Sequence, residues 1–291
     1  MADHLRILVI GGHPADVFDH CGGTMAHHVR AGDSVTCLAL TQGLRIHDIV
    51  ISEKLRFGTS GYSAEEIDKM CAQREQVKYD EVLKACGIFG VTDVRFLRYD
   101  DKVLQVTEEL ITATAKVIRD VRPDIVITHY PFENGGVGSH HANTAKIAMD
   151  AMQFAGTVDF DDPNPAWRVA QLFFMSPMET RFFSSFTGYL HAAYCPFYVD
   201  ITDVVDLKIK ALDCIVSQQY EGAYARKRTE TMEGLYGHNC GVGYAEAFVP
   251  NRPELYHLLP LSDWLRERTN EEEKKTRERG SVMEAYKVEM E

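Results

Sequence analysis

The sequence predicts an α/β fold, in which a mostly parallel, Rossmann-like sheet carries helices on both faces and the C-terminal half is more elaborate. Two observations lead to this prediction. Residues 6–10, 35–40 and 125–128 are short apolar runs rich in β-branched residues, which is typical of strands buried on both faces. Segments with helical character separate these runs, so strands and helices alternate up to about residue 155.

The helices of this first part have recognisable ends. Ser63 is a suitable N-cap for a long helix over 64–86, and Glu65 and Glu66 fall in its first turn, where negative charge is favourable. Thr107 caps another helix in the same way. The remaining predictions are helices over 22–29, 107–121 and 141–154, a strand over 94–97, and a long polar loop over 44–63.

The second half is less regular. Residues 172–175 and 197–201 read as strands and 204–217 as a helix, whereas 220–253 is rich in glycine and aromatic residues without a clear period. Residues 266–291 are densely charged and are predicted to be an exposed helix or a disordered tail. We therefore expect one domain over 1–265, followed by this charged tail.

Bulk composition narrows the class of protein. The formal net charge is −12, and an acidic surface repels nucleic acid and anionic membranes, so neither is an expected partner. The seven cysteines are scattered and form no CxxC pair, which favours reduced thiols and a cytoplasmic location. No signal peptide and no apolar run of membrane-spanning length are expected.

Metal-binding side chains follow two of the predicted strands. His13 and Asp16 come directly after the first strand, and His129 and then His141 follow the strand at 125–128. If these strands are neighbours, their carboxyl ends share one edge of the sheet, where open α/β folds bind ligands. His13, Asp16 and His141 would then offer two imidazoles and a carboxylate, the ligand set of a catalytic zinc site with an open position for water. The same set accepts other divalent transition metals.

Several motifs are similar, in order and spacing, to one family. The segment HPAD at 13–16 followed by GGT at 22–24 resembles the HPDDE and GGT opening of the LmbE-like (PIG-L) deacetylases. The resemblance extends from about residue 5 to residue 250, and implies an LmbE-like fold with zinc held by His13, Asp16 and His141. The further matching segments are Arg74 and Glu75 in a long helix, LRYDDKVL at 97–104, RPDIVITHYP at 122–131, HH at 140–141, VDIT at 199–202 and YAEAF at 244–248.

The sequence departs from this family at residues that carry the chemistry. The aspartate that serves as general base in the deacetylases is replaced by Ala15, the next glutamate by Val17, and the usual glutamate after the second strand by Leu44. In the family's second motif, often HPDH, this chain has GSHH at 138–141. The HxAD form resembles the 4-oxalomesaconate hydratases, a branch that adds water to an unsaturated, carboxylated compound.

Other residues are candidates for the missing roles. His140, His129 and Glu133 are candidate catalytic residues; the alternatives are a hydrogen-bonding neighbour of the ligands for His140, strand-end packing for His129 and a loop residue for Glu133. Arg74 and Arg45 could bind a carboxylate or phosphate, and Asp101 and His238 could complete the pocket. An ordinary surface position is the alternative for Arg74 and Arg45, and a solvated turn is the alternative for Asp101.

The leading hypothesis is a zinc-dependent enzyme that uses metal-activated water on a small polar metabolite, carboxylated or N-acylated. Because Ala15 cannot act as a base, this reasoning favours hydration of an unsaturated carboxylate. The alternative is removal of an acyl group from an N-acetylglucosaminyl-type compound, and a third hypothesis is a metal-binding protein without catalysis. The resemblance also implies a possible homo-oligomer, since the family often forms rings or dimers.

Overall fold

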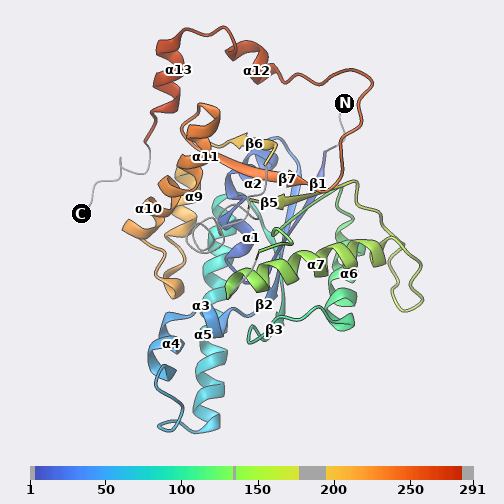
Figure 1. Ribbon diagram of the computed structural model, residues 1–291. Helices are drawn as coiled ribbons and strands as arrows, with labels where there is room; N and C mark the ends of the chain where they lie inside the picture. The colour runs from blue at the N-terminus through green and yellow to red at the C-terminus, as the bar shows by residue number, and fades with distance from the viewer. Residues whose placement is uncertain (1–3, 134–135, 177–194, 284–291) are drawn as a thin grey trace.

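A computed structural model describes residues 4–133, 136–176 and 195–283 of the chain. Its centre is a seven-stranded sheet with the order β3-β2-β1-β4-β5-β7-β6 (Figure 1). The strands from β1 to β5 pair in parallel, whereas β7 is antiparallel to both β5 and β6. The strands are β1 (Arg6–Gly11), β2 (Ser34–Thr41), β3 (Asp93–Tyr99), β4 (Ile125–Thr128), β5 (Gln171–Met175), β6 (Phe197–Asp200) and β7 (Ala245–Pro250).

Helices cover both faces of the sheet, as the sequence predicts. Ile7 and Val9 of β1 pack into one buried cluster with α1, α2, α5 and α9, while Leu8 and Ile10 pack into another with α6 and α7. Alternate residues of one strand are therefore buried on opposite faces, which explains its unbroken apolar run. These helices are α1 (Asp16–Asp19), α2 (Gly22–Arg30), α5 (Ala64–Ile88), α6 (Glu108–Val121), α7 (Val137–Ala155) and α9 (Val205–Leu212).

Several predicted boundaries need correction. The stretch 44–63 is not one long loop, because α3 (Leu44–His47) and α4 (Ile49–Leu55) lie within it. The helix predicted over 141–154 begins earlier, at Val137, and the helix predicted over 204–217 ends at Leu212 before a short 3-10 helix, η1 (Val216–Gln218). The stretch without a clear period contains α10 (Ala223–Thr231), α11 (Glu233–Cys240) and β7.

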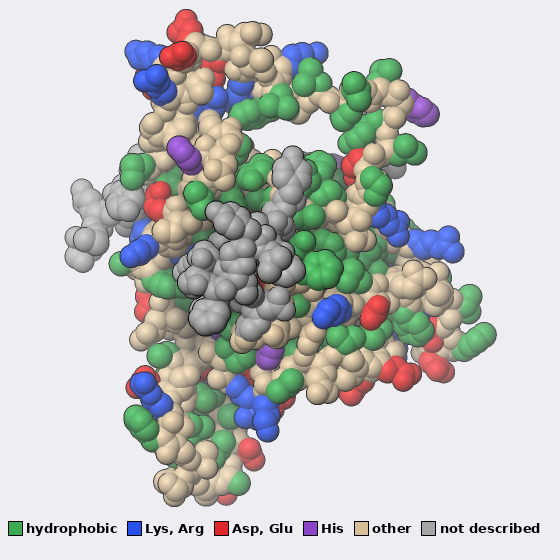
Figure 2. All heavy atoms as spheres, in the orientation of Figure 1, with side chains coloured by type: hydrophobic (Ala, Val, Ile, Leu, Met, Phe, Trp, Pro, Cys, Tyr) green, Lys and Arg blue, Asp and Glu red, His purple; other side chains and the backbone are tan. Residues whose placement is uncertain are grey.

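The last described part of the chain leaves the body after β7. It contains α12 (Asp263–Arg268) and α13 (Glu273–Gly280), which lie above the sheet in Figure 1. Figure 2 shows an open gap between this segment and the body of the molecule. Residues 284–291 of the predicted tail lie outside the described residues. Within the described ranges, none of the helices combines the length and apolarity needed to cross a bilayer.

The start of α2 explains the GGT motif. Glu246 of β7 accepts hydrogen bonds from the amides of Gly23 and Thr24 at 3.0 and 2.8 Å, and so satisfies donors at the helix N-terminus. A Cβ atom at Gly22 would lie 2.5 Å from Phe89, and one at Gly23 would lie 2.6 Å from a side-chain carbon of Ile201. Glycine is required at both positions because neighbouring side chains approach the helix backbone directly.

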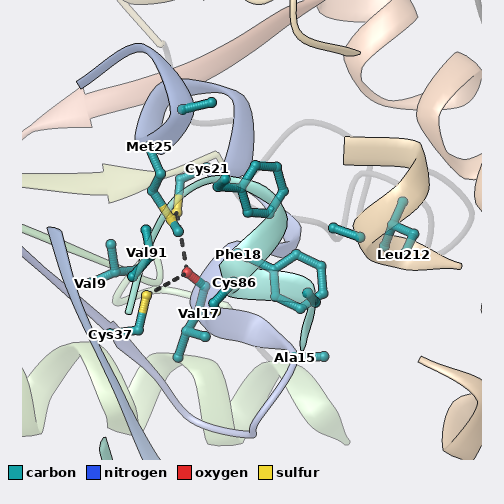
Figure 3. Packing of buried hydrophobic residues seen from close by; sticks show 14 of the residues in the cluster. Val9, Ala15, Val17, Phe18, Cys21, Met25, Cys37, Cys86, Val91 and Leu212 are labelled. Atoms are coloured by element: carbon teal, nitrogen blue, oxygen red, sulfur yellow. Dashed lines mark hydrogen bonds between the residues drawn. The ribbon is translucent and has the colours of Figure 1, made fainter. Parts of the chain in front are cut away.

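The cysteines include a buried group beside β1. Figure 3 shows Cys21, Cys37 and Cys86 packed with Val17 and Met25, with the Cys21 and Cys37 thiols directed at the Val17 carbonyl. Burial raises the pKa of the Cys21 thiol well above its ordinary value, so these groups behave as apolar core side chains. All seven cysteines of the chain are free thiols in this structure.

Candidate metal centre

The site forms where β1 and β4 end side by side. The two strands pair in parallel, with Ile10 opposite Thr128, so the turn after β1 and the loop after β4 meet at one edge. Gly12 lies against α7, and a Cβ atom there would lie 2.7 Å from the Thr144 hydroxyl. This close approach brings the N-terminal part of α7, which carries His140 and His141, against the turn that carries His13 and Asp16.

The structure brings His13, Asp16 and His141 together as one buried group. One ligand atom from each lies within 4.8 Å of the others. The Asp16 Oδ2 atom is 3.0 Å from His13 Nδ1 and 3.6 Å from His141 Nε2. Ligand atoms around a tetrahedral zinc ion lie about 3.3 Å apart, given Zn–N and Zn–O bonds of about 2.0–2.1 Å. The donor set and its spacing therefore fit a divalent metal.

Electrostatics keep the carboxylate of this group ionised. Burial alone would raise the pKa of Asp16, but His13 and His141 outweigh that effect and hold the pKa well below its ordinary value. The Asp16 carboxylate also accepts a hydrogen bond from the His13 backbone amide at 2.7 Å. A buried carboxylate that is ionised and held in place is a ready metal ligand.

Glu133 contacts a candidate ligand rather than an open pocket. Its Oε2 atom is 2.9 Å from His141 Nδ1, and both side chains are buried. A carboxylate that accepts the Nδ1–H of an imidazole directs the Nε2 lone pair towards a metal. His129, Glu133 and His141 also form a second group whose ligand atoms lie within 4.8 Å of one another. His141 belongs to both groups.

Because Glu133 orients His141, Glu133→Gln is expected to weaken metal binding about 10- to 100-fold, the usual effect of losing such a partner. Chelator competition at neutral pH measures this affinity. Glu109→Gln, at an exposed carboxylate that hydrogen-bonds Tyr99, is the matched control and should leave the metal affinity unchanged. Equal metal affinity in wild type and Glu133→Gln would show that Glu133 does not orient His141.

His129 and His140 complete the ring of imidazoles. His129 Nε2 accepts a hydrogen bond from the Gly12 amide at 3.2 Å, and its ring stacks on His141 with centroids 3.9 Å apart. His140 Nδ1 is 3.2 Å from His13 Nε2, and its own Nε2 accepts from the Leu104 amide at 3.5 Å. Burial lowers the pKa of both imidazoles. Both residues contact the candidate ligands directly.

The residues proposed to bind substrate are engaged elsewhere in this structure. Arg74 pairs with the buried carboxylate of Asp48 at 2.9 Å, and Arg45 pairs with exposed Asp100 at 2.6 Å. Asp101 is fully buried and accepts hydrogen bonds from backbone amides at the start of α3. His238 lies in α11 and lines a cleft beside residues 280–283, away from the metal-binding group.

His47 in α3 was not anticipated from the sequence. Its ring lies edge-on to that of His13, with centroids 4.5 Å apart. Its Nε2 atom is buried and has no hydrogen-bond partner among the described residues. Burial lowers the pKa of this imidazole to about 3, so it is neutral at pH 7. No sequence signal indicates His47, because the stretch around it has no apolar period.

A second buried group, also not anticipated, lies behind the site. Arg228 of α10 pairs with Asp19 of α1, with Nε donating to Oδ1 at 2.8 Å, and both side chains are buried. Burial alone would raise the pKa of Asp19, but Arg228 outweighs that effect and lowers it below the ordinary value. The ionised pair therefore stabilises the fold fully at pH values above about 3.9, the pKa of Asp19 in the unfolded chain. This stabilisation is lost as the pH falls through the lower pKa that Asp19 has in the folded protein.

Asp19→Asn is accordingly expected to be less stable than wild type at pH 6, with the difference narrowing as pH falls below about 4. Urea unfolding at a series of pH values measures the difference. Asp203→Asn, at an exposed carboxylate that pairs with His27, should instead have the same free energy of unfolding as wild type at every pH. If the difference in free energy of unfolding between Asp19→Asn and wild type stayed constant from pH 6 to below pH 4, the ionised Asp19–Arg228 pair would not be its cause.

Comparison with known proteins identifies the family. Residues 8–152, which include the whole metal-binding group, match the family model for PIG-L, the GlcNAc-PI de-N-acetylases. A 1D-myo-inositol 2-acetamido-2-deoxy-alpha-D-glucopyranoside deacetylase from Geodermatophilus obscurus is 27% identical over 253 residues, which cover 80% of this chain and 82% of the relative. Diacetylchitobiose deacetylase from Thermococcus kodakarensis is 27% identical over 264 residues, which cover 89% and 88%.

A solved structure shows the same fold. The 4-carboxy-2-hydroxymuconate hydratase GalB from Pseudomonas putida KT2440 aligns with a TM-score of 0.69 at 20% identity, and the alignment covers 88% of this chain and 100% of that chain. At this level of identity the likeness concerns the fold. Together with the family match, it confirms the Rossmann-like α/β architecture predicted from the sequence. The chain is therefore an enzyme of the PIG-L superfamily, the family of the GlcNAc-PI de-N-acetylases.

Proposed function

We propose that this protein is a metal-dependent N-deacetylase that hydrolyses the acetamide of a small amino-sugar compound. The buried group of His13, Asp16 and His141 carries the proposal, because it offers the donor set that such a reaction needs. The relatives named above support the substrate class, since both are deacetylases of N-acetylated sugars. In the reaction the amide C–N bond breaks, water supplies the new C–O bond, and the amine leaves with a proton.

This proposal replaces the hydration favoured by the sequence alone. Two deacetylases match at least 80% of the chain at 27% identity, whereas the hydratase is similar only in its fold. The absence of the family's base at Ala15 was the reason for favouring hydration, and that reason weakens because His140 and His47 lie close to His13. Small N-acetylated molecules are therefore the expected partners, and the free cysteines support the cytoplasm as the compartment.

Zinc is the metal that we propose for the site, because two imidazoles and one carboxylate are typical of catalytic zinc. When bound, the metal supplies Lewis-acid chemistry, polarising the acyl carbonyl and making water more acidic. The protein itself positions the ligands: Glu133 orients His141, and the His13 amide holds the Asp16 carboxylate. The His129 ring stacks on that of His141, with centroids 3.9 Å apart.

We further propose that His47 donates a hydrogen bond to the substrate in place of the family's missing acidic residues. Leu44 occupies the position of the usual glutamate, and His47 lies three residues later in α3, so both fall on the same side of the helix. The His47 side chain lies beside His13, is half-buried and neutral, and its buried Nε2 atom has no hydrogen-bond partner among the described residues. A neutral imidazole in that state can donate to an oxygen that gains negative charge during hydrolysis.

Buried charges hold this imidazole in place. The carboxylate of Asp101 accepts from the Leu44 and Arg45 amides at 3.0 Å each, which fixes the start of α3. The Lys78 ammonium donates to the His47 carbonyl at 2.9 Å, which fixes its end. Burying a charge is costly unless it is hydrogen-bonded, and here two buried charges hold the four residues of α3. Precise positioning is what a substrate-binding group requires.

His47→Ala is expected to lower kcat/KM for deacetylation roughly 100-fold, the usual cost of losing one such donor, with metal affinity unchanged. Added imidazole should restore part of the rate in this variant. Tyr62→Ala, at an exposed position outside α3, is the control for general effects on the protein. Full activity of His47→Ala would remove His47 from the site, whereas loss of metal would make it a ligand instead.

The proposed function is tested by product analysis with purified, zinc-loaded protein. Acetate release from N-acetylglucosamine conjugates and diacetylchitobiose is expected, together with stoichiometric metal by elemental analysis. A parallel assay follows the absorbance of a conjugated, carboxylated enone. Loss of that absorbance without acetate release from any N-acetyl sugar would reject the deacetylase in favour of the hydratase. Neither activity in a metal-loaded protein would favour a non-catalytic role.

A further inference from the structure

A cleft of about 470 Å³ lies at the edge of the sheet opposite the metal centre. It is bounded by the C-terminal end of α7, the start of β5 and the chain that follows β7. The α7 helix spans the distance between the two places, because His141 lies in its N-terminal part and the cleft lies beside its last turns (Figure 1). At a rise of 1.5 Å per residue, the two are roughly 20 Å apart. The cleft is therefore separate from the metal-binding group, and its volume is that of a small-molecule site.

The cleft has an apolar floor. Val169 and Leu172 are buried beneath it, and Met149 and Met152 of α7 are partly buried against the same hydrophobic cluster. Methionine side chains are flexible and polarisable, so they adapt to an aliphatic or aromatic group placed against them. This floor suits the carbon body of an organic ligand better than a bare inorganic ion.

Two arginines, Arg168 and Arg252, line the same cleft, and its lining contains no acidic side chain. Most other arginines in the described ranges pair with a carboxylate, as expected in a chain with a net charge of −12. Among the described residues, neither the Arg168 nor the Arg252 guanidinium has an ion-pair or hydrogen-bond partner. Glu254, two residues after Arg252, instead accepts a hydrogen bond from Gln171 Nε2 at 2.8 Å. Both guanidinium groups are therefore available to an anion.

The backbone that carries each arginine is held by its surroundings. The buried Gln171 side chain donates to the Arg252 carbonyl at 3.0 Å and accepts from the Arg252 amide at 3.2 Å. Next to Arg168, the Trp167 amide donates to the carbonyl of the last residue of α7 at 2.8 Å. A Cβ atom at Gly156 would lie 3.2 Å from Arg168 Cγ, so the stem of this arginine packs against the end of the helix. A fixed backbone lowers the entropy that ligand binding costs.

We propose that this cleft binds a small organic anion, in which a phosphate or carboxylate is joined to an apolar body. The guanidinium groups of Arg168 and Arg252 bind the anionic oxygens, because their planar N–H donors match two oxygens of such a group. The apolar body lies on the methionine side chains of the floor. This site goes beyond the proposed chemistry at the metal centre and does not depend on it.

Isothermal titration calorimetry of the full, zinc-loaded chain with phenyl phosphate tests the proposal. Wild type is expected to bind phenyl phosphate at low salt, and to bind inorganic phosphate at least about 10-fold more weakly because that ion has no apolar body. Both arginines are exposed, so added salt should weaken the binding. Arg168→Gln/Arg252→Gln should lose about 10- to 100-fold in affinity for phenyl phosphate and retain the circular dichroism spectrum of wild type.

Arg268→Gln is the matched control. Among the described residues Arg268 also has no carboxylate partner, but it lies against Trp264, outside the cleft. Its affinity for phenyl phosphate should equal that of wild type. A loss as large as that of the double variant would mean that the anion responds to overall charge, which would overturn the site.

Nuclear magnetic resonance with isotope-labelled methionine methyl groups locates the bound probe. Phenyl phosphate should shift the signals of Met149 and Met152, and leave that of Met25, which is buried in the cluster on the other face of the sheet. The proposal would be overturned if wild type bound no phenyl phosphate at millimolar concentration, or if the double variant bound it as tightly as wild type, as it would for a probe held at the metal centre. Equal affinity for inorganic phosphate would overturn the organic ligand.

Discussion

Asp16→Asn is expected to lose stoichiometric zinc and, with it, all measurable deacetylation. The Asp16 Oδ2 atom lies at the centre of the site, 3.0 Å from His13 Nδ1, 3.2 Å from His129 Nε2 and 3.6 Å from His141 Nε2. The substitution keeps the shape of the side chain but removes its negative charge. Since changes to residues that merely support ligands cost about 10- to 100-fold in affinity, loss of the carboxylate itself should cost more than 100-fold.

Elemental analysis and chelator competition measure this loss directly, without an activity assay. Asp100→Asn is the matched control, because Asp100 is an exposed carboxylate that pairs with Arg45 and the Lys102 amide, outside the metal-binding group. Its metal content should equal that of wild type. An Asp16→Asn protein that retains one zinc per chain at wild-type affinity would place the metal elsewhere, with the group of His129, Glu133 and His141 as the alternative position.

The central strands could be predicted because their own residues determine them. The run at 7–10 is apolar at every position, since helices pack on both faces of β1, and β4 is similarly apolar for the same reason. The long helix α5 was equally clear, because Ser63 and Glu66 form the local capping box that the structure contains. The residues within these elements were therefore sufficient to predict them.

Elements that depend on distant residues could not be predicted. The amides at the start of α3 are bound by Asp101, more than fifty residues away in the sequence. Strand β7 carries Glu246 facing inward, a pattern that does not read as a buried strand until its partners are known. Their stability comes from tertiary contacts, which local propensity does not report.

The same distinction applies to the site. The positions of His13, Asp16 and His141 followed from strand ends and from the family resemblance, and the structure places them together. The role of Glu133 did not follow, because a sequence does not show that its carboxylate contacts His141. His47 was overlooked for a related reason: α3 brings it to His13, and α3 itself could not be foreseen.

The buried ion pairs of Lys208 account for the second large effect that we expect. Lys208 of α9 is fully buried and donates to Glu233 at 2.8 Å and to Glu246 at 2.6 Å. Burial alone would lower the pKa of Lys208, but the two carboxylates outweigh that effect and raise it above the ordinary value. Glu246 in turn holds the start of α2, so this one ammonium links α9, α11 and β7 with α2.

Lys208→Met should lower the free energy of unfolding by about 3–5 kcal/mol, because it leaves two buried carboxylates without a counter-ion while retaining most of the side-chain volume. Urea unfolding at pH 7 measures the change. Lys210→Met, in the same helix, removes an exposed pair with Asp206 and should change stability by less than about 1 kcal/mol. A Lys208→Met protein as stable as Lys210→Met would mean that Glu233 binds a proton instead, since burial already raises the pKa of Glu233. In that case the free energy of unfolding of Lys208→Met should increase at acid pH, whereas that of wild type should decrease.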